Sequence, residues 1–355
     1  MKIRLIGQRN STGIGTHYAN FADALKRRSG VGELVEEIDF QNLPQIEQAI
    51  QTSQPTDINI SFVAANIHEL FKGTNIQWIV FESTQISDQI LDTLKSADQV
   101  WVPSTWGRDV LVQNGIKRLH IRVVPEGVDS DRYHSFGRPR ANYPLTFLFV
   151  GKYEERKSCR QILDAWADAF KDDTTVRLIF KTNYFVDAPD KQKELADHVE
   201  QLNLNNLTVI WDQYTDQEIL NLYQHSDVFV FPTKGEGWGL PIIEAAAMGM
   251  PIISTDYSAQ HDYLIEIANS CIFVPYELGP VNCPDFQRYY TSTNGWGNWA
   301  FPSQQGLVSA LKQAKDNYSN LAQNAVKNSE IVRKNWSWAR SADQALVVME
   351  QNARF

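Results

Sequence analysis

Glu236-Gly237-Trp238-Gly239-Leu240-Pro241-Ile242-Ile243-Glu244 joins a short apolar run to a pattern typical of a helix start. The preceding residues 228–231 read Val-Phe-Val-Phe, which is typical of a buried parallel strand. Pro241 suits the first position of a helix, alanines continue that helix, and Gly249 can cap its end. The stretch therefore predicts a strand, a glycine loop and a helix, the repeating unit of an α/β fold.

The same loop carries groups for two kinds of ligand chemistry. Gly235, Gly237 and Gly239 leave the backbone without Cβ atoms, so N–H groups at a helix start can approach an anion. Glu236 and Glu244 can accept hydrogen bonds from hydroxyl groups. A nucleotide-sugar offers both partners, a diphosphate and sugar hydroxyls. The alternative is that both glutamates are solvated acids, which are favourable near a helix N-terminus.

Length and composition define the class of protein. A chain of 355 residues suggests two domains, and 43% hydrophobic with 21% charged residues indicates a globular protein. The net charge of −9 argues against nucleic acid as a partner. Three cysteines without metal-ligand spacing, no signal-peptide pattern and no membrane-spanning run favour a cytoplasmic protein. Lys26-Arg27-Arg28 suits either a helix C-terminus or a peripheral membrane contact.

Short apolar runs alternate with helical patterns along the whole chain, which predicts doubly wound parallel sheets. Glycine and proline cluster in residues 135–144, so the domain boundary is expected there. The strands expected in the first half are 3–6, 33–37, 58–62, 78–81, 99–102 and 121–124. Those expected in the second half are 146–150, 176–180, 207–211, 228–231, 252–254 and 272–274.

Residues 234–251 resemble the signature of retaining glycosyltransferases of family 4, written E-G-(Phe or Trp)-G-L-P-x-x-E-A and followed by G-x-P. The resemblance implies the GT-B fold, two Rossmann-like domains facing across a cleft. The expected domains are an acceptor-side domain at 1–140, a donor-binding domain at 141–320, and helices at 321–355, the last crossing back to the first domain.

The resemblance also implies the reaction. A hexose would move with retention from a nucleotide-sugar, UDP-glucose being the first choice, to a sugar or lipid-linked hydroxyl acceptor of the cell envelope. Neither a metal ion nor another cofactor would be required. Glu244 would bind the ribose, and Glu236 would contact the transferred sugar and support charge at its anomeric carbon without acting as a nucleophile.

Two lysines follow the first strand of the expected second domain. Gly151-Lys152 precedes Lys157 by the spacing at which the family places two cations on the donor diphosphate. Such cations stabilise the charge that develops on the leaving group. The family more often has arginine at the first position, and the alternative is a solvated turn, because Glu154 and Glu155 stand between the lysines.

A second glycine loop follows the first strand of the chain. Gly13-Ile14-Gly15 weakly matches a dinucleotide fingerprint, but Tyr18 stands at the third glycine. In the family this loop faces the donor diphosphate and the acceptor, so the resemblance makes the two glycines, Thr16 and His17 candidates for the site. His17 is as readily a structural residue.

The remaining candidates follow other strands. Glu82 is expected at a strand end, where it binds sugar hydroxyls or is an edge acid without a ligand. Ser104 should cap a helix in which Arg108 lies one turn further on. Gln213 and Tyr214 follow the strand after which relatives seat the base. The donor-binding set is completed by the loop residues Gly237, Trp238, Gly239 and Leu240.

Two other functions remain open from the residues. An NAD-dependent oxidoreductase would use Gly13-Ile14-Gly15 with acids near Glu36 and Asp39. A catalytically silent sugar-nucleotide-binding subunit would keep the loop without turnover. Residues 276–302 show no periodicity and are rich in glycine, proline and aromatic residues, which predicts either a functional loop or a surface insertion.

Overall fold

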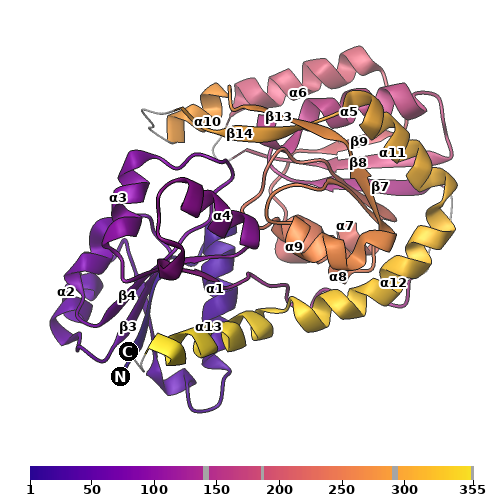
Figure 1. Cartoon of the computed structure of the whole chain (residues 1–355). Coiled ribbons are helices and arrows are strands. Elements are labelled where there is room, and N and C mark those ends of the chain that lie inside the picture. The colour runs from indigo at the N-terminus through magenta and orange to yellow at the C-terminus, as the bar shows by residue number, and fades with distance from the viewer. Residues whose placement is uncertain (139–143, 185–187, 290–294, 353–355) are drawn as a thin grey trace. The chain divides into compact units, whose positions relative to one another are not determined.

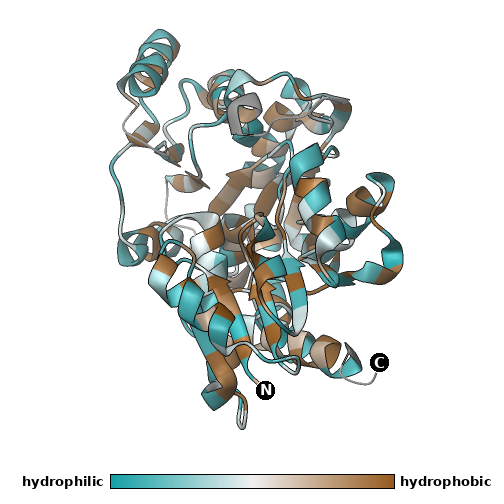
Figure 2. Cartoon of the chain, turned by 90° about the vertical axis from the view of Figure 1, so that its left-hand side faces the viewer, coloured by the Kyte–Doolittle hydropathy of each residue, from teal (hydrophilic) through white to brown (hydrophobic). Residues whose placement is uncertain are grey.

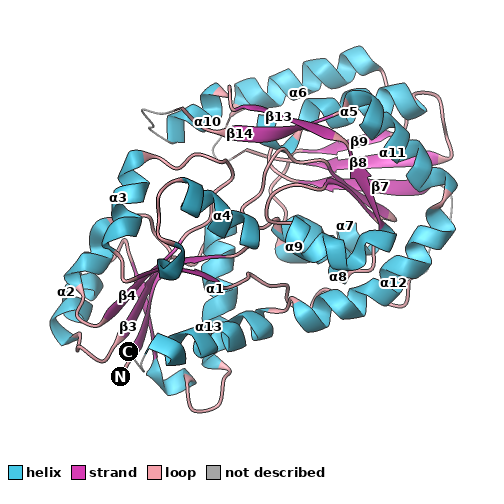
Figure 3. Cartoon of the chain, in the orientation of Figure 1, coloured by secondary structure: helices cyan, strands magenta, loops and turns pink. Residues whose placement is uncertain are grey.

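The structure is a computed structural model that describes residues 1–138, 144–184, 188–289 and 295–352 (Figure 3). It divides into two compact units. The first unit comprises Met1–Asp129, Val281–Asn298 and Asn335–Phe355, and the second unit comprises Ser130–Pro280 and Trp299–Lys334. The expected boundary at 140 falls outside the described residues, and this division lies earlier, after Asp129.

The first unit contains a parallel sheet of six strands in the order β2-β1-β3-β4-β5-β6. Its strands are β1 (Ile3–Gly7), β2 (Val35–Asp39), β3 (Ile58–Ser61), β4 (Thr74–Trp78), β5 (Gln99–Val102) and β6 (Ile121–Val123). Its main helices are α1 (Gly13–Lys26), α2 (Leu43–Thr52), α3 (Asp88–Ser96), α4 (Thr105–Gln113), α10 (Pro284–Tyr289) and α13 (Trp338–Asn352). The last helix, α13, packs on α1 and belongs to the first unit (Figure 1).

The second unit repeats the plan with the strand order β12-β11-β10-β7-β8-β9, again parallel throughout. Its strands are β7 (Leu145–Val150), β8 (Val176–Lys181), β9 (Leu207–Ile210), β10 (Val228–Phe231), β11 (Ile252–Thr255) and β12 (Cys271–Val274). Its main helices are α5 (Cys159–Phe170), α6 (Pro189–Leu202), α7 (Asp216–Gln224), α8 (Leu240–Ala247), α9 (His261–Leu264), α11 (Gln304–Asp316) and α12 (Tyr318–Asn335). Both predicted doubly wound sheets are therefore confirmed.

Hydrophobic residues concentrate on the strands, whereas the helices alternate hydrophobic and hydrophilic residues (Figure 2). All residues of β1, β3, β5 and β10 are buried. Only β10 is apolar throughout, as expected of a central parallel strand, whereas the other three also bury Arg4, Asn59, Ser61 and Gln99.

One strand lies elsewhere than predicted. The apolar run 78–81 suggested a strand, but β4 is Thr74–Trp78. The polar side chain of Gln77 is accommodated there because its amide donates to Ser61 O at 3.1 Å and Val63 O at 3.0 Å. Ile79 and Phe81 then pack into the core beyond the strand end. The strand was predicted too late in the sequence because the prediction followed hydropathy, and residues 79–81 are more apolar than β4 itself.

Residues 276–302 are also more regular than predicted. They contain β13 (Tyr276–Pro280), helix α10 and β14 (Asn298–Pro302), and the two strands form a separate sheet. Residues 290–294 lie outside the described part of the chain. Glycine and proline obscured these strands in the sequence, although a two-stranded sheet tolerates both because its strands are edges.

Candidate functional site

The candidate site of the second unit lies where its strand order reverses. β7 and β10 are neighbours, but the chain continues from β7 to β8 on one side and from β10 to β11 on the other. Ligands of doubly wound sheets bind beyond the carboxyl ends of such a strand pair. The segments that follow β7 and β10 are residues 151–157 and 232–239. These two segments contain the lysines and Glu236 that the sequence analysis proposed for the site.

Glycine conformation shapes the loop after β10. Gly239 has a φ of +93° and immediately precedes α8, which begins at Leu240 with Pro241 in its first turn. A Cβ on Gly239 would lie 3.0 Å from the hydroxyl of Tyr263. That hydroxyl donates to the carbonyl oxygens of Trp238 and Gly239. Gly249, with a φ of +70°, ends the helix as predicted.

Glu236 is the centre of a buried polar cluster. Lys157 Nζ donates to its two carboxylate oxygens at 2.6 and 2.8 Å, and Arg156 Nη1 donates to Oε1 at 2.8 Å. Thr233 Oγ1 donates to the same oxygen at 2.7 Å, and the Glu236 amide donates to Ser258 Oγ at 2.9 Å. The structure therefore brings Lys157 and Glu236, residues 79 apart in sequence, into direct contact.

The cluster keeps Glu236 ionised. Burial raises the pKa of this carboxyl, but the charges of Arg156 and Lys157 and the bonds from Lys157 and Thr233 outweigh burial, so its pKa is lowered. Lys157 is only 8% exposed, and its ammonium also lies 4.8 Å from the Phe231 ring centroid. The alternatives of a solvated turn for Lys157 and a solvated acid for Glu236 are therefore wrong.

Sequence reasoning missed Arg156, Thr233 and Ser258. Arg156 sits beside Lys157 in a charged run, so its charge was visible but its partner was not. Thr233 and Ser258 carried no signal, because an isolated hydroxyl residue has no spacing pattern. Lys234, also missed as a site residue, forms an ion pair with Glu155 and lies 4.8 Å from the Phe301 ring centroid.

Lys152 and Lys157 lie in different surroundings. Lys152 is half-buried, and its carbonyl oxygen accepts a hydrogen bond from the Cys159 thiol at 3.3 Å. Gly151 directly follows β7 at a position with no space for a side chain, since a Cβ there would lie 2.9 Å from the Phe149 ring. Contacts with Glu236 are thus shown for Lys157, while the diphosphate role of Lys152 stays a prediction.

Glu244 projects from α8 toward two tyrosines. Tyr223 Oη donates to Glu244 Oε2 at 3.0 Å. Burial raises the pKa of Glu244 to about 7, although hydrogen bonds from Tyr223 and Tyr133 and the charge of Arg132 oppose the rise. Because Glu244 is half-buried and accepts a hydrogen bond from Tyr223, it is not a solvated helix-start acid.

The other donor candidates have varied surroundings. Trp238 is 2% exposed and its ring packs 5.1 Å from that of Tyr263, so it supports the loop. Gln213 is exposed and accepts a bond from Asn183 Nδ2 at 3.0 Å, and Lys181 Nζ lies 5.4 Å from the Tyr214 ring centroid. Both candidates follow β9, two strands away from the reversal point.

In the first unit, the glycine loop after β1 opens α1 as predicted. Gly15 is required sterically, because a Cβ would lie 2.1 Å from Asn10 Oδ1, whereas Gly13 has open space around it. Thr12, not predicted, caps the helix by accepting from the Gly15 amide at 3.1 Å. Thr16 is half-buried in the next turn.

Tyr18 fills the position where a dinucleotide fingerprint has its third glycine. A Cβ on Gly7 would lie 2.4 Å from the Tyr18 ring, so this ring packs directly on the end of β1. The NAD-dependent alternative therefore gains no support from this loop.

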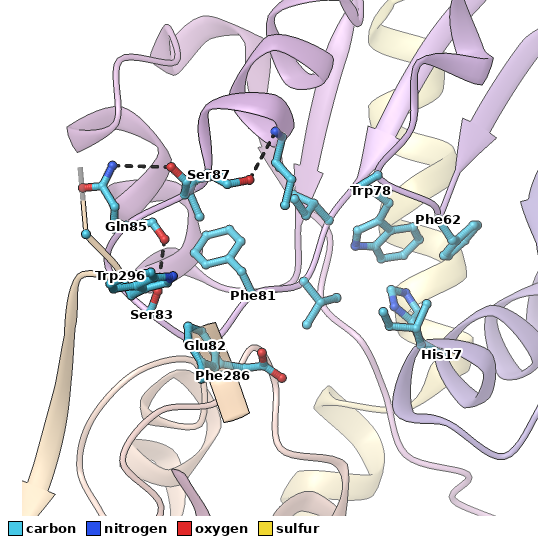
Figure 4. A pocket seen from close by; sticks show the side chains of 17 residues that line it. His17, Phe62, Trp78, Phe81, Glu82, Ser83, Gln85, Ser87, Phe286 and Trp296 are labelled. Carbon is cyan, nitrogen blue, oxygen red and sulfur yellow. Dashed lines mark hydrogen bonds between the residues drawn. The ribbon is translucent and has the colours of Figure 1, made fainter. Parts of the chain in front are cut away.

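His17 and Glu82 line one cavity of the first unit, whereas Arg108 and Thr16 are not among its lining residues (Figure 4). His17 is 1% exposed, and its ring centroid lies 4.4 Å from that of Trp78. Burial lowers the pKa of His17 to about 3. Arg108 instead pairs with Asp109 at 3.0 Å, and Ser104 caps α4 as predicted.

Among the described residues, no group of three or more histidine, cysteine, aspartate or glutamate side chains is arranged to hold a metal ion. No helix among those residues has both the length and the apolar character to span a bilayer.

Comparison with known proteins identifies the family that the site resembles. Residues 134–278 match the family model described as glycosyl transferases group 1. Mannosylfructose-phosphate synthase of Agrobacterium fabrum is 25% identical over 175 residues, which are 45% of this chain and 38% of that protein. The serotype-specific mannosyltransferase WbdA of Escherichia coli is 34% identical over 114 residues, 31% of this chain and 13% of that protein. These matches span less than half of either relative.

The structural likeness extends further. The crystal structure of Anabaena Alr3699/HepE in complex with UDP has a TM-score of 0.74 at 15% identity, covering 99% of this chain and 100% of that one. At this identity the likeness establishes the fold. The predicted GT-B fold and the resemblance carried by residues 234–251 are thereby confirmed.

Proposed function

We propose that this chain is a glycosyltransferase that moves a hexose from a nucleoside diphosphate to a hydroxyl acceptor, with UDP-glucose as its donor. The observation that carries the proposal is the buried contact of Lys157 with Glu236 at the reversal point of the second sheet. It combines a cation for a leaving diphosphate with a carboxylate for sugar hydroxyls.

Each charged group has a definite task in this proposal. The bond from the anomeric carbon to the diphosphate breaks, and a bond from that carbon to the acceptor oxygen forms on the same face. The acceptor proton passes to the leaving phosphate oxygen. Lys157 uses two of its three N–H donors on Glu236, so one remains for the phosphate. Lys152 is the second phosphate cation.

Glu236 and Glu244 serve the donor in different ways. Glu236 stays ionised beside Arg156 and Lys157 and supports the positive character that develops at the anomeric carbon. Glu244 accepts hydrogen bonds from the ribose hydroxyls. The reaction proceeds with retention and without a metal ion, because these residues supply the charges that the leaving group requires.

The relatives support this choice of donor and define its competitor. Alr3699/HepE has been crystallised with UDP and also with UDP-glucose. One sequence relative is named a mannosyltransferase and the other a mannosylfructose-phosphate synthase, so a mannose donor is the competitor. The acceptor expected from the family is a cell-envelope polysaccharide or glycolipid.

A donor screen tests the proposal. Free nucleotide released from UDP-glucose, UDP-galactose, GDP-mannose and ADP-glucose is measured with wild-type protein and with Lys157→Ala. We expect release from UDP-glucose by the wild type and a loss of at least tenfold in the variant. Release from GDP-mannose alone would show that the donor is GDP-mannose and would leave the proposed type of reaction unchanged. Release from none of the four would support the silent-subunit alternative.

A further inference from the structure

A cavity of about 220 Å³ lies in the first unit beside the segment that follows β4 (Figure 4). Its walls are mainly apolar. An engineered apolar cavity of about 150 Å³ binds benzene, so this one has room for a somewhat larger ring. Ile14, at its edge, is 54% exposed, which is unusual for a large aliphatic side chain.

One wall of the cavity comes from the segment Val281–Asn298, which lies between β13 and β14 in sequence but belongs to the first unit. This segment contributes Phe286 and Trp296 to the lining. The Asn298 amide donates to Thr84 Oγ1 at 2.8 Å. A Cβ on Gly297, whose φ is +73°, would lie 2.4 Å from the Gln85 amide nitrogen. The backbone of residues 297–298 is therefore closely fitted to the segment after β4, next to Trp296 in the cavity wall.

Few polar groups line the cavity, and most of them already form hydrogen bonds within the protein. The Ser83 hydroxyl donates to Gln85 O at 3.0 Å, and Nε2 of the Gln85 side chain donates to Ile86 O at 3.4 Å. Ser87 Oγ caps α3 by accepting from the Ile90 amide. A sugar ring placed here would lose water from many hydroxyl groups and find few partners, which is costly. The cavity suits an apolar ring better than a sugar.

Glu82 provides the exception to this apolar character. It is half-buried and lines the same cavity as Phe286 and Trp296 (Figure 4). A carboxylate accepts several hydrogen bonds, so it can bind a ligand hydroxyl in addition to a protein partner. His17, which also lines the cavity, is neutral near pH 7 because burial lowers its pKa to about 3. The carboxylate is thus matched to a neutral ligand that carries a hydrogen-bond donor.

We propose that this cavity binds a small aromatic alcohol, with its ring against Phe286 and Trp296 and its hydroxyl donating to Glu82. That this alcohol is the sugar acceptor rests on the proposed function, in which its hydroxyl turns the proton from Glu82 to the leaving phosphate oxygen as the new bond forms. Its binding in the cavity does not rest on that function. The proposal replaces the polysaccharide acceptor expected from the family with a compound whose glycosylated end is an aromatic ring.

The test uses two aromatic probes of similar shape, only one of which carries a hydrogen-bond donor. 2-Naphthol and 2-methoxynaphthalene are titrated into the whole protein without nucleotide, and binding is followed by their fluorescence. We expect 2-naphthol to bind saturably and about fivefold to tenfold more tightly than the ether, the effect of one net hydrogen bond. Glu82→Leu should abolish this preference. Phe286→Ala should weaken both probes about tenfold, whereas Phe40→Ala, outside the cavity lining, should not.

Several results would overturn the proposal. They are absence of saturable binding by either probe, an unchanged affinity in Phe286→Ala, an unchanged preference in Glu82→Leu, or saturable binding of glucose at this site in preference to 2-naphthol. Donor turnover separates the two proposals. Nucleotide release without binding of 2-naphthol contradicts only the cavity proposal, and binding without nucleotide release from any donor contradicts only the proposed function.

Discussion

Replacing Glu244 by glutamine should stabilise the protein, and the gain should grow with pH. Burial raises the pKa of Glu244 from the ordinary 4.5 to about 7 in the folded protein. Between these two values the folded state binds more protons at this site than the unfolded state does. Stability contributed by the protonated carboxyl is therefore present below pH 4.5 and lost as the pH rises through 7. Glutamine stays neutral and can still accept the Tyr223 hydrogen bond.

The size of the effect follows from the two pKa values. Each pH unit between them corresponds to about 1.4 kcal/mol. Linkage then gives a cost of ionised Glu244 of about 1 kcal/mol at pH 5 and about 3 kcal/mol at pH 8. The difference in unfolding free energy between Glu244→Gln and wild type should consequently increase by about 2 kcal/mol over this range.

Urea unfolding followed by circular dichroism at pH 5, 6, 7 and 8 measures this difference. Glu200→Gln is the matched control, because Glu200 lies on α6 of the same unit and is exposed. The control should show no change with pH relative to wild type. A Glu244→Gln difference that stays flat, or that falls as the pH rises, would refute the description of Glu244 as a carboxyl whose pKa is raised by folding.

Three further predictions concern the site of the second unit. Lys157→Ala should lower turnover at saturating donor by about 10²–10³-fold, because its charge acts on the breaking bond; steady-state kinetics that show only a higher Michaelis constant would make Lys157 a binding residue. EDTA should leave nucleotide release unchanged, and an absolute dependence on Mn²⁺ in the same assay would contradict the proposed role of the lysines. Gly239→Ala should destabilise the fold by about 1–2 kcal/mol, since its φ of +93° disfavours a Cβ, and an unchanged urea midpoint would show that the loop relaxes.

The sequence was sufficient for features that depend on local pattern. The twelve strands of the two main sheets all overlap the predicted ranges, but β2 begins two residues later than predicted and β4 four residues earlier. The larger shift of β4 arises because Gln77 is a buried amide that bonds to a neighbouring strand. β13 and β14 were missed because glycine and proline interrupt them. For the site, the family signature selected Glu236 and the spacing after Gly151 selected Lys157, but Thr233 and Ser258 reach Glu236 through contacts that only folding creates. The pKa of Glu244 likewise depends on Tyr223 and Tyr133, which no spacing in the sequence connects to it.

Calorimetric titration of UDP into wild type and Glu244→Ala at pH 8 tests most directly that the second unit is a nucleotide-sugar site. We expect UDP to bind the wild type with one site per chain, and NADH not to bind. Loss of hydrogen bonds to an ionised carboxylate should weaken UDP in the variant by roughly 1.5–3 kcal/mol, about 10–150-fold. Equal UDP affinity in the two proteins, or binding of NADH in place of UDP, would contradict the assignment.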